Sequence, residues 1–330
     1  MSLVLTLFLF FQIIPISSRL NIIGTDFLFL LPDSETDIFL NPANIFFWDK
    51  KFAASFSSYT NNFFQLNTNL PVTFQNLLHI KVSKSNYAGI FAFHYLFVYE
   101  KEEEKSFFQN CGNLPFLIGY NWGEKKIGFL LSYQWNSWEN KDSLKEPRRE
   151  KEVYFPLKVG FVSGEERKIE VIFDFVPYRK ENLKSYQFIN FLIKGNLGEI
   201  PQHHFSWGIN YQKENQIFKF SAGYCLASTY NFYGLIFNTY LGLKPIFSIL
   251  KNNLETNIFF PYGLIFSFGK IKVLFGFKNE LVKTKKNVYL SEYNYNLGFN
   301  YRFTDNLEFY FFNLSSASFR RWFFDFKITF

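Results

Sequence analysis

The sequence predicts an all-β protein, a transmembrane antiparallel β-barrel of about 14–16 strands preceded by an N-terminal plug or latch segment. Three observations predict this fold: apolar and polar residues alternate with period two, aromatic residues are abundant, and the chain ends in an alternating strand. In such a barrel the apolar set of each strand faces lipid and the polar set faces the lumen.

The last ten residues, RWFFDFKITF, form the predicted barrel-closing strand. One side carries Trp322, Phe324, Phe326, Ile328 and Phe330. The other side carries Arg321, Asp325, Lys327 and Thr329, joined by Phe323. A terminal strand of this kind is typical of outer-membrane barrels, where it closes the barrel and is recognised by the barrel-assembly machinery.

The composition agrees with half-apolar strands in a bilayer. The chain has 48 Phe, 20 Tyr and 6 Trp in 330 residues, and 22% of its residues are aromatic. Its mean hydropathy is nevertheless only −0.06, and 19% of its residues are charged. A helical membrane protein would be far more hydropathic, and a soluble core rarely needs so many rings.

Alternation recurs along the chain from about residue 52. The clearest strand sets Tyr293, Tyr295, Leu297, Phe299 and Tyr301 against polar residues and a glycine. Similar patterns cover 87–98, 127–136, 167–175 and 205–211, and the first strand is expected at Phe52 to Ser58. The alternative fold, a large soluble β-sandwich or propeller, is disfavoured because aromatic residues occupy the outward set of nearly every strand.

The connectors predict the orientation of the strands. Short turns are expected at 123–124, 163–164, 269–270 and 304–306, and longer polar loops near 99–113, 138–151, 177–184, 243–254, 283–288 and 314–319. Counted back from the terminal strand, every turn falls at one end and every loop at the other. Outer-membrane barrels have short periplasmic turns and longer external loops.

The number of strands depends on one element. Asn62 to Ser83 is read either as one bent strand, giving sixteen, or as two strands split at Pro71, giving seventeen. Bacterial barrels have even strand numbers, so fourteen and sixteen stay open. Pro156 and Pro261 lie inside strand patterns and are expected at bulges or frayed positions, because proline cannot donate a ladder hydrogen bond.

The chain divides into three predicted parts. Residues 1–18 are predicted to be a signal peptide, because the apolar run from Leu3 to Ile14 is too short to span a bilayer and precedes Ser17 and Ser18. Residues 19–50 form the plug or latch segment, and 51–330 the barrel. Cys111 is expected in an external loop and Cys225 near a periplasmic strand end, too far apart for a disulfide.

The segment Leu20 to Phe47 resembles the FadL and PorV/PorQ superfamily of outer-membrane proteins. The resemblance rests on Phe27-Leu28, on Asn41-Pro42-Ala43 directly before the first strand, and on YAGIFAFHYLFV at 87–98. Asn44 stands where glycine is usual and Ile45 where leucine is usual. The alternative is a plain barrel-entry turn, because Asn-Pro is a common turn dipeptide.

The resemblance implies two functions between which the sequence does not choose. In the FadL branch, the N-terminal segment takes part in the passage of small hydrophobic molecules across the outer membrane. In the PorV/PorQ branch, the barrel is a non-enzymatic component of a type IX secretion or surface-attachment complex. A structural barrel without a dedicated substrate is a third alternative. The predicted ligand or latch residues are Asn41, Pro42, Ala43, Asn44, Phe46 and Phe47.

No catalytic, metal or cofactor site is predicted. His94 faces the predicted interior, but spacing assigns it no partner, and His203 and His204 point to opposite sides of a strand, which makes a poor metal pair. The remaining histidine is His79, and the sequence has no Gly-rich phosphate loop and no Cys/His ligand spacing. An enzyme is therefore not expected.

The remaining features concern the surface. The charged runs at 100–105 and 141–152 are read as solvated loop tips, although they could bind cations or a surface partner. Trp135, Trp138, Trp207 and Trp322 are expected in interfacial girdles. The net charge of +7 is not gathered into one patch, so nucleic acid is not an expected partner. The expected location is the bacterial outer membrane, and the expected partners are its lipid, the assembly machinery, and a small hydrophobic ligand or secretion-complex proteins.

Overall fold

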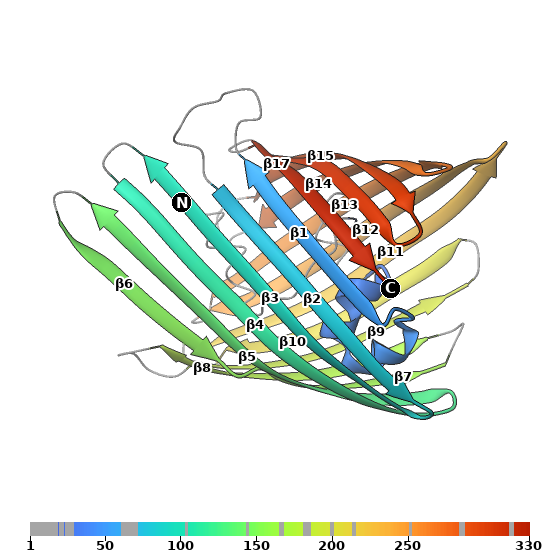
Figure 1. The fold of residues 1–330 in the computed structure, drawn as a ribbon, viewed down its shortest axis with the longest axis horizontal. Coiled ribbons are helices and arrows are strands. Elements are labelled where there is room, and N and C mark those ends of the chain that lie inside the picture. The colour runs from blue at the N-terminus through green and yellow to red at the C-terminus, as the bar shows by residue number, and fades with distance from the viewer. Residues whose placement is uncertain are drawn as a thin grey trace.

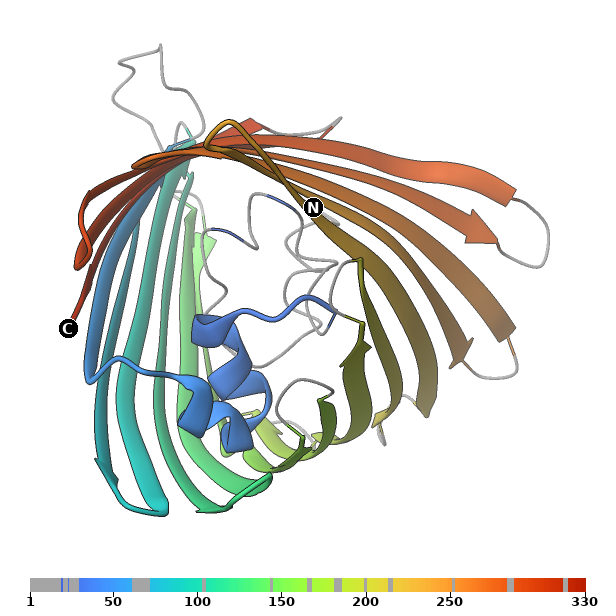
Figure 2. The ribbon, with the colours of Figure 1, turned by 90° about the vertical axis from the view of Figure 1, so that its right-hand side faces the viewer.

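A computed structural model shows one closed antiparallel β-barrel with a short helical segment inside it (Figures 1 and 2). The structure describes Arg19, Ile23 and residues 30–60, 72–102, 105–142, 145–164, 168–180, 186–198, 201–212, 216–250, 253–283, 288–316 and 320–330. The predicted signal peptide and the Phe27-Leu28 pair lie outside these residues. No helix in the described ranges is long and apolar enough to cross a membrane.

The segment before the barrel contains two short helices, α3 (Ser34–Leu40) and η2 (Pro42–Phe47). The wall is built by strands β1 (Phe52–Thr60), β2 (Val72–Lys84), β3 (Tyr87–Glu102), β4 (Lys105–Trp122), β5 (Lys125–Asp142), β6 (Lys145–Tyr154), β7 (Leu157–Ser163), β8 (Ile169–Lys180), β9 (Tyr186–Leu197), β10 (Gln202–Gln212), β11 (Ile217–Phe232), β12 (Leu235–Leu250), β13 (Asn253–Phe268), β14 (Ile271–Lys283), β15 (Val288–Thr304), β16 (Leu307–Ser316) and β17 (Arg320–Thr329).

The barrel closes between its first and last strands, as the terminal sequence predicts. β1 pairs antiparallel with β17 in a register that places Phe56 opposite Phe326. Backbone hydrogen bonds from Lys51 and Phe52 to the carbonyl oxygen of Phe330, at 2.7 and 3.0 Å, extend this seam to the last residue. Among the strands that the structure describes, closure leaves none as a free sheet edge, as a lipid environment requires.

Seventeen strands occupy sixteen positions in the wall, because β6 and β7 are two halves of one interrupted strand. Both halves pair with β5 on one side and with β8 on the other. The interruption lies at Phe155 and Pro156, so Pro156 marks a break as expected. Sixteen strands satisfy the even-number rule for bacterial barrels.

The other prolines in the wall also coincide with ladder gaps. Pro261 and its neighbour Phe260 have no register partner on β12, and Pro245 has none on β11. Pro115 lies in the corresponding gap between β3 and β4. Each proline keeps its pairing on the opposite side of its strand. The missing N–H donor of each proline therefore causes a local irregularity in the ladder, and the sheet stays continuous.

The alternating pattern gives an apolar outside and a polar inside. On β5, Phe129, Leu131 and Tyr133 are exposed on the outer face, whereas Ser132 and Gln134 are buried on the inner face. On β17, Phe326 is exposed and Asp325 and Thr329 are buried, and Phe330, directly after the strand, is exposed. This is the inverse of a soluble sandwich, so the alternative fold is wrong.

The predicted polarity of the connectors is confirmed, but the predicted external loops are mostly strand. The turns at 123–124, 269–270 and 305–306 share one end of the barrel, the end at which β1 begins and β17 ends. At the other end β3, β4, β5, β6, β12 and β13 extend through much of 99–113, 138–151 and 243–254. Polar sequence did not end these strands, because a paired backbone satisfies its hydrogen bonds in water as well as in lipid.

The cysteine prediction needs a matching correction. Cys111 lies within β4 and not in a loop, and Cys225 lies in the middle of β11. Both thiols are free and buried. Cys111 faces the lumen, where its thiol donates to Asn136 Oδ1 at 2.9 Å.

Candidate functional site

The candidate functional site is the contact between residues 30–48, which we call the lumenal segment, and the inner wall. Figure 2 shows α3 and η2 inside the ring of strands. η2 contacts β3, β4, β5 and β7. The segment ends directly before β1, which begins at the short-turn end.

Local sequence explains why these few residues are helical. The Asp33 carboxylate caps α3 by accepting a hydrogen bond from the Thr36 backbone N–H at 3.1 Å, and the Asp37 carboxylate accepts one from the Asp33 N–H at 3.1 Å. Asn41 ends α3 and caps η2, where its side-chain oxygen accepts from the Ala43 N–H at 3.1 Å. Pro42 follows at the first position of η2, which lacks an internal partner anyway.

The asparagines of the Asn-Pro-Ala-Asn sequence bind one wall carboxylate. The side-chain amides of Asn41 and Asn44 each donate to Glu170 Oε2 on β8 at 2.8 Å. The Lys168 ammonium lies 2.9 Å from Glu170 Oε1 and donates to Asn44 Oδ1 at 2.7 Å. Both carboxylate oxygens are therefore used, and Asn44 is held from two sides.

A second ammonium joins α3 to this group. Lys194 on β9 lies 2.9 Å from Asp37 Oδ1 and 3.5 Å from Glu170 Oε1. Burial raises the pKa of the Asp37 carboxyl, while the Lys194 ammonium opposes that shift. We call Asp37, Asn41, Asn44, Lys168, Glu170 and Lys194 the polar anchor. Because buried charges are costly unless paired, the two lysines depend on the carboxylates, and above all on Glu170, which both of them contact.

A further lysine holds the end of α3. Lys158 on β7 donates to the Phe39 carbonyl oxygen at 3.0 Å and lies 3.7 Å from Asp174 Oδ2 on β8. A cation at this position satisfies a terminal helix carbonyl. The wall thus supplies a positive charge where the helix presents an unpaired acceptor.

A row of glycines makes room for η2. Gly119, Gly128 and Gly160 are direct neighbours on β4, β5 and β7. A Cβ at Gly160 would stand 1.8 Å from Asn41 Oδ1, and one at Gly128 would stand 2.3 Å from the Pro42 carbonyl carbon. Gly128 accepts only glycine while the segment is in place, because the atoms that a Cβ would meet there are backbone and cannot yield as a flexible side chain can. At Gly160 the nearest atom belongs to the Asn41 side chain, which is itself held by its cap on η2 and by Glu170.

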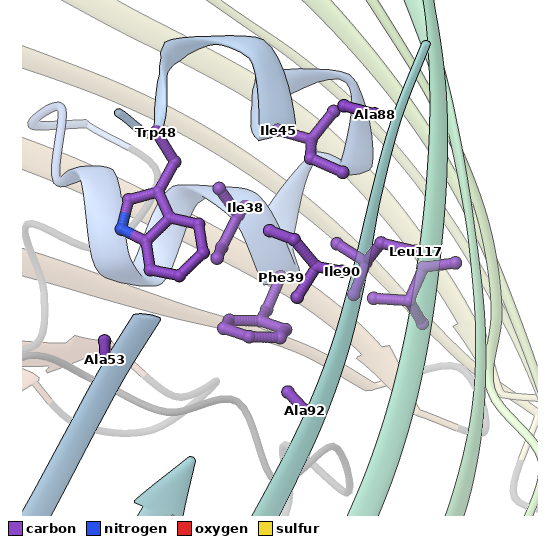
Figure 3. Close-up of a cluster of buried hydrophobic side chains, with 10 residues drawn as sticks. Ile38, Phe39, Ile45, Trp48, Ala53, Ala88, Ile90, Ala92 and Leu117 are labelled. Atoms are coloured by element: carbon purple, nitrogen blue, oxygen red, sulfur yellow. The ribbon is translucent and has the colours of Figure 1, made fainter. Parts of the chain in front are cut away.

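An apolar cluster lies beside the anchor (Figure 3). Phe39 and Trp48 are 2% exposed, and Ile38 and Ile45 are fully buried. They meet an apolar strip of the wall formed by Ala53, Ala88, Ile90, Ala92, Leu117 and Leu130. Burying such side chains stabilises the docked segment, at roughly 25 cal/mol for each Å² removed from water.

The start of the segment contacts a different part of the wall. Leu30 and Leu31 join a second apolar cluster with Cys225, Ile265, Leu274, Tyr310 and Phe312, from β11, β13, β14 and β16. Glu35 forms an ion pair with Lys327 on β17. Residues 30–48 therefore reach from one group of strands to another inside the barrel.

The predicted ligand or latch residues lie together in this contact. Asn41, Pro42, Ala43 and Asn44 are buried, and Phe46 packs against the apolar cluster. Phe47 is 39% exposed. Its ring lies 4.2 Å from the Lys168 ammonium and 4.9 Å from that of Lys126, within cation–π range. Their ligand role stays a prediction.

Sequence reasoning missed the wall partners. Lys168 and Glu170 belong to the polar set that the sequence predicts for residues 167–175. Lys194 lies on β9, 157 residues from its partner Asp37. The missing signal was register: Glu170 pairs directly with Lys194 across β8 and β9. Inward charges at neighbouring register positions are the pattern that would have identified them.

The histidines are also placed by the fold. His94 faces the lumen as predicted and has a partner that spacing did not show: its Nε2 lies 2.8 Å from Nε2 of His79. His203 is exposed and His204 buried, which confirms their opposite directions. Within the described ranges, no group of three or more His, Cys, Asp or Glu is arranged to hold a metal ion.

Comparison with known proteins extends only to the fold. No family model matches the chain, and no curated protein matches it. CdiB from Acinetobacter baumannii superposes with a TM-score of 0.60 at 8% identity, over 85% of this chain and 60% of that one. A bacterial polysaccharide outer membrane secretin superposes with a TM-score of 0.50 at 9% identity, over 85% of this chain and 99% of that one. The chain thus spans about 60% of the length of CdiB.

Fold and polarity together define the class of protein. The wall is a closed antiparallel barrel of sixteen strand positions with an apolar outer face and a largely polar inner face. Such a surface is stable only in a bilayer, and closed barrels of even strand number span the bacterial outer membrane. The protein is a bacterial outer-membrane β-barrel.

Proposed function

We propose that this barrel passes small hydrophobic molecules across the outer membrane and that the lumenal segment gates the path at the short-turn end. The resemblance of Asn41-Pro42-Ala43 to the FadL and PorV/PorQ superfamily supports such a role, because passage of hydrophobic compounds is the function of one of its two branches. The observation that carries the proposal is the contact of residues 30–48 with two separate groups of wall strands. Solutes entering at this end would have to displace the segment.

The inner wall supports an apolar solute. A water-filled barrel has a polar interior, yet the apolar strip on β1 and β3–β5 and the second cluster on β11–β16 both contact the lumenal segment inside the barrel. The lumenal segment covers parts of both. Displacement of the segment would expose apolar side chains of the wall. Water solvates such side chains poorly, whereas an apolar molecule would bind to them favourably.

The polar anchor favours two distinct positions of the segment, docked and released, and disfavours a continuous range of intermediate positions. Buried ion pairs are poor sources of net stability, because desolvation offsets most of their attraction. However, if one partner of a buried ion pair is removed, the other charge is left buried and unpaired. The anchor therefore favours an all-or-none change, in which Asn41, Asn44 and Asp37 leave Glu170 and the two lysines together.

The first experiment is native mass spectrometry of the barrel after gentle detergent extraction from its own membrane. We expect a stoichiometric apolar small molecule that is lost when residues 20–47 are deleted. Stoichiometric protein partners without such a molecule would contradict passage and support the alternative, a PorV/PorQ-like secretion or attachment component.

A transport measurement complements it. Cells producing the Glu170→Gln variant are expected to take up a radiolabelled apolar molecule faster than cells with the parent chain, because the anchor loses its central charge. Glu280→Gln is the matched control, since Glu280 is an inward carboxylate on β14 whose Oε1 accepts from Asn257 at 3.2 Å. Equal uptake by all three would exclude gating by this contact.

A further inference from the structure

Beneath the lumenal segment, two imidazoles form a direct hydrogen bond. Nε2 of His79 on β2 and Nε2 of His94 on β3 are 2.8 Å apart. The two residues are 4% and 1% exposed. A contact of this length between ring nitrogens requires that one nitrogen carries hydrogen and the other a lone pair.

The neighbours of the pair fix which nitrogen donates. Ser132 Oγ donates to Asn113 Oδ1, which leaves the Asn113 amide nitrogen to donate to His94 Nδ1 at 3.3 Å. His94 therefore carries its hydrogen on Nε2 and donates to His79. His79 in turn carries hydrogen on Nδ1, a buried atom without a hydrogen-bond partner in the described part of the chain.

This arrangement uses every ring lone pair. The two lone pairs of the neutral rings are His94 Nδ1, which accepts from Asn113, and His79 Nε2, which accepts from His94. An added proton must therefore break one of these two hydrogen bonds. It must also place a positive charge among buried rings, which is costly without a counter-charge.

The pair packs against the segment itself. The Phe39 ring lies 4.9 Å from the His79 ring and 4.8 Å from the His94 ring, between centroids. The Trp48 ring lies 5.9 Å from that of His79. Phe39 and Trp48 are also members of the apolar cluster that holds the segment. Any rearrangement of the two imidazoles is passed directly to these two contacts.

The charged groups on the surrounding elements do not neutralise an imidazolium. Lys81 on β2 donates to the Trp48 carbonyl, and Lys158 on β7 donates to the Phe39 carbonyl and pairs with Asp174 on β8. On α3, Asp37 pairs with Lys194, and Glu35 pairs with Lys327. After Trp48, Asp49 is largely exposed beside Lys50. Ser132 and Asn113, from β5 and β4, are neutral.

We propose that the His79–His94 pair is a proton-operated release for the lumenal segment, so that acidification frees the segment from the wall. Imidazole is the side chain that changes charge in mildly acidic water, and a buried pair that opens on protonation is an established kind of switch. This regulation rests on the proposed gating function, because it acts on the same contact.

The test measures the position of the segment directly. Spin labels are placed on Pro32→Cys, an exposed position before α3, and on Glu124→Cys in the β4–β5 turn, and their distance is measured by electron paramagnetic resonance in lipid at neutral and mildly acidic pH. The parent chain without these cysteines gives the background, since Cys111 and Cys225 are buried. We expect one narrow distance at neutral pH and at least about a tenfold larger displaced population in acid.

The decisive comparison uses a variant in which neither position can be protonated in acid. His79→Gln/His94→Gln keeps hydrogen-bonding groups at both positions and should show no displaced population in acid. His204→Gln, a buried inward histidine on β10, is the matched control and should respond like the parent. If the double variant does not fold, each single glutamine variant should show a reduced response. An equal response in the glutamine variants would assign the effect to the carboxylates and overturn the proposal, as would no response in the parent.

The outcomes separate this proposal from the proposed function. A pH-insensitive segment in a barrel that still carries apolar molecules contradicts only the switch. A segment that is released by acid in a barrel that binds and passes no apolar molecule contradicts only the transport function.

Discussion

Asn41 and Glu170, separated by 129 residues in sequence, are joined by a 2.8 Å hydrogen bond from the Asn41 amide to the Glu170 carboxylate. The same Asn41 side chain caps η2 through its oxygen. One asparagine thus shapes the lumenal segment and attaches it to the wall. This double role explains why an Asn-Pro sequence at the entrance to the barrel is more than a turn.

Removing the charge at the centre of the polar anchor should loosen the segment. Glu170→Gln leaves Lys168 and Lys194 without their shared carboxylate, and breaking a buried pair costs roughly 3–5 kcal/mol. We expect cleavage of the segment by an added protease to become at least about a hundredfold faster, with little change in barrel stability. Glu280→Gln is the control. Unchanged cleavage would mean that the apolar cluster alone holds the segment.

The neighbouring carboxylate should behave differently. Burial raises the pKa of Asp37, so its protonated form contributes stability that is present below the unfolded pKa of about 3.9 and is lost as the pH rises through the folded value. Asp37→Asn imitates the protonated form at every pH. We therefore expect protease protection of the segment at neutral pH to be equal to that of the parent or greater. A loss comparable to that of Glu170→Gln would refute this ordering.

A methyl group in the glycine row should prevent the segment from docking. Gly160→Ala places a Cβ 1.8 Å from Asn41 Oδ1, and Gly128→Ala places one 2.3 Å from the Pro42 backbone. Each variant should fold as a barrel but expose the segment to protease. Gly89→Ala on β3 is the control, because its nearest atom is the Leu117 carbonyl oxygen at 3.6 Å. Heat-modifiable migration in gels checks that all three barrels are closed.

The terminal aromatic offers a test of assembly apart from stability. Phe330→Ala retains the backbone hydrogen bonds to Lys51 and Phe52 and removes a ring that is 62% exposed. We expect refolding into detergent to be nearly unchanged, whereas the amount of folded barrel in cells falls several-fold. Phe268→Ala, a similarly exposed ring at the end of β13, controls for the loss of lipid contact. Equal losses in cells would contradict recognition of the terminal residue.

Local sequence was sufficient for the wall. Because the side-chain period of a strand is two, residues such as Phe129 and Ser132 reveal their opposite faces without knowledge of any partner strand. The count of sixteen needed the structure, since only pairing shows that the halves around Pro156 share both neighbours. The charged runs at 100–105 and 141–152 were predicted to be loop tips, but strands extend through much of them. The reason is the same, because composition does not show where strand pairing stops.

The site was only partly within reach of the sequence. The Asn41-Pro42-Ala43-Asn44 stretch and the inward direction of His94 could be read locally, because capping and strand parity act over a few residues. Glu170, Lys194 and His79 could not be assigned, since their partners are set by barrel closure and strand register. The sequence by itself determined a lipid-facing barrel with a distinct N-terminal segment. The tertiary structure alone decided what that segment touches, because contacts across a lumen join residues that no local period connects.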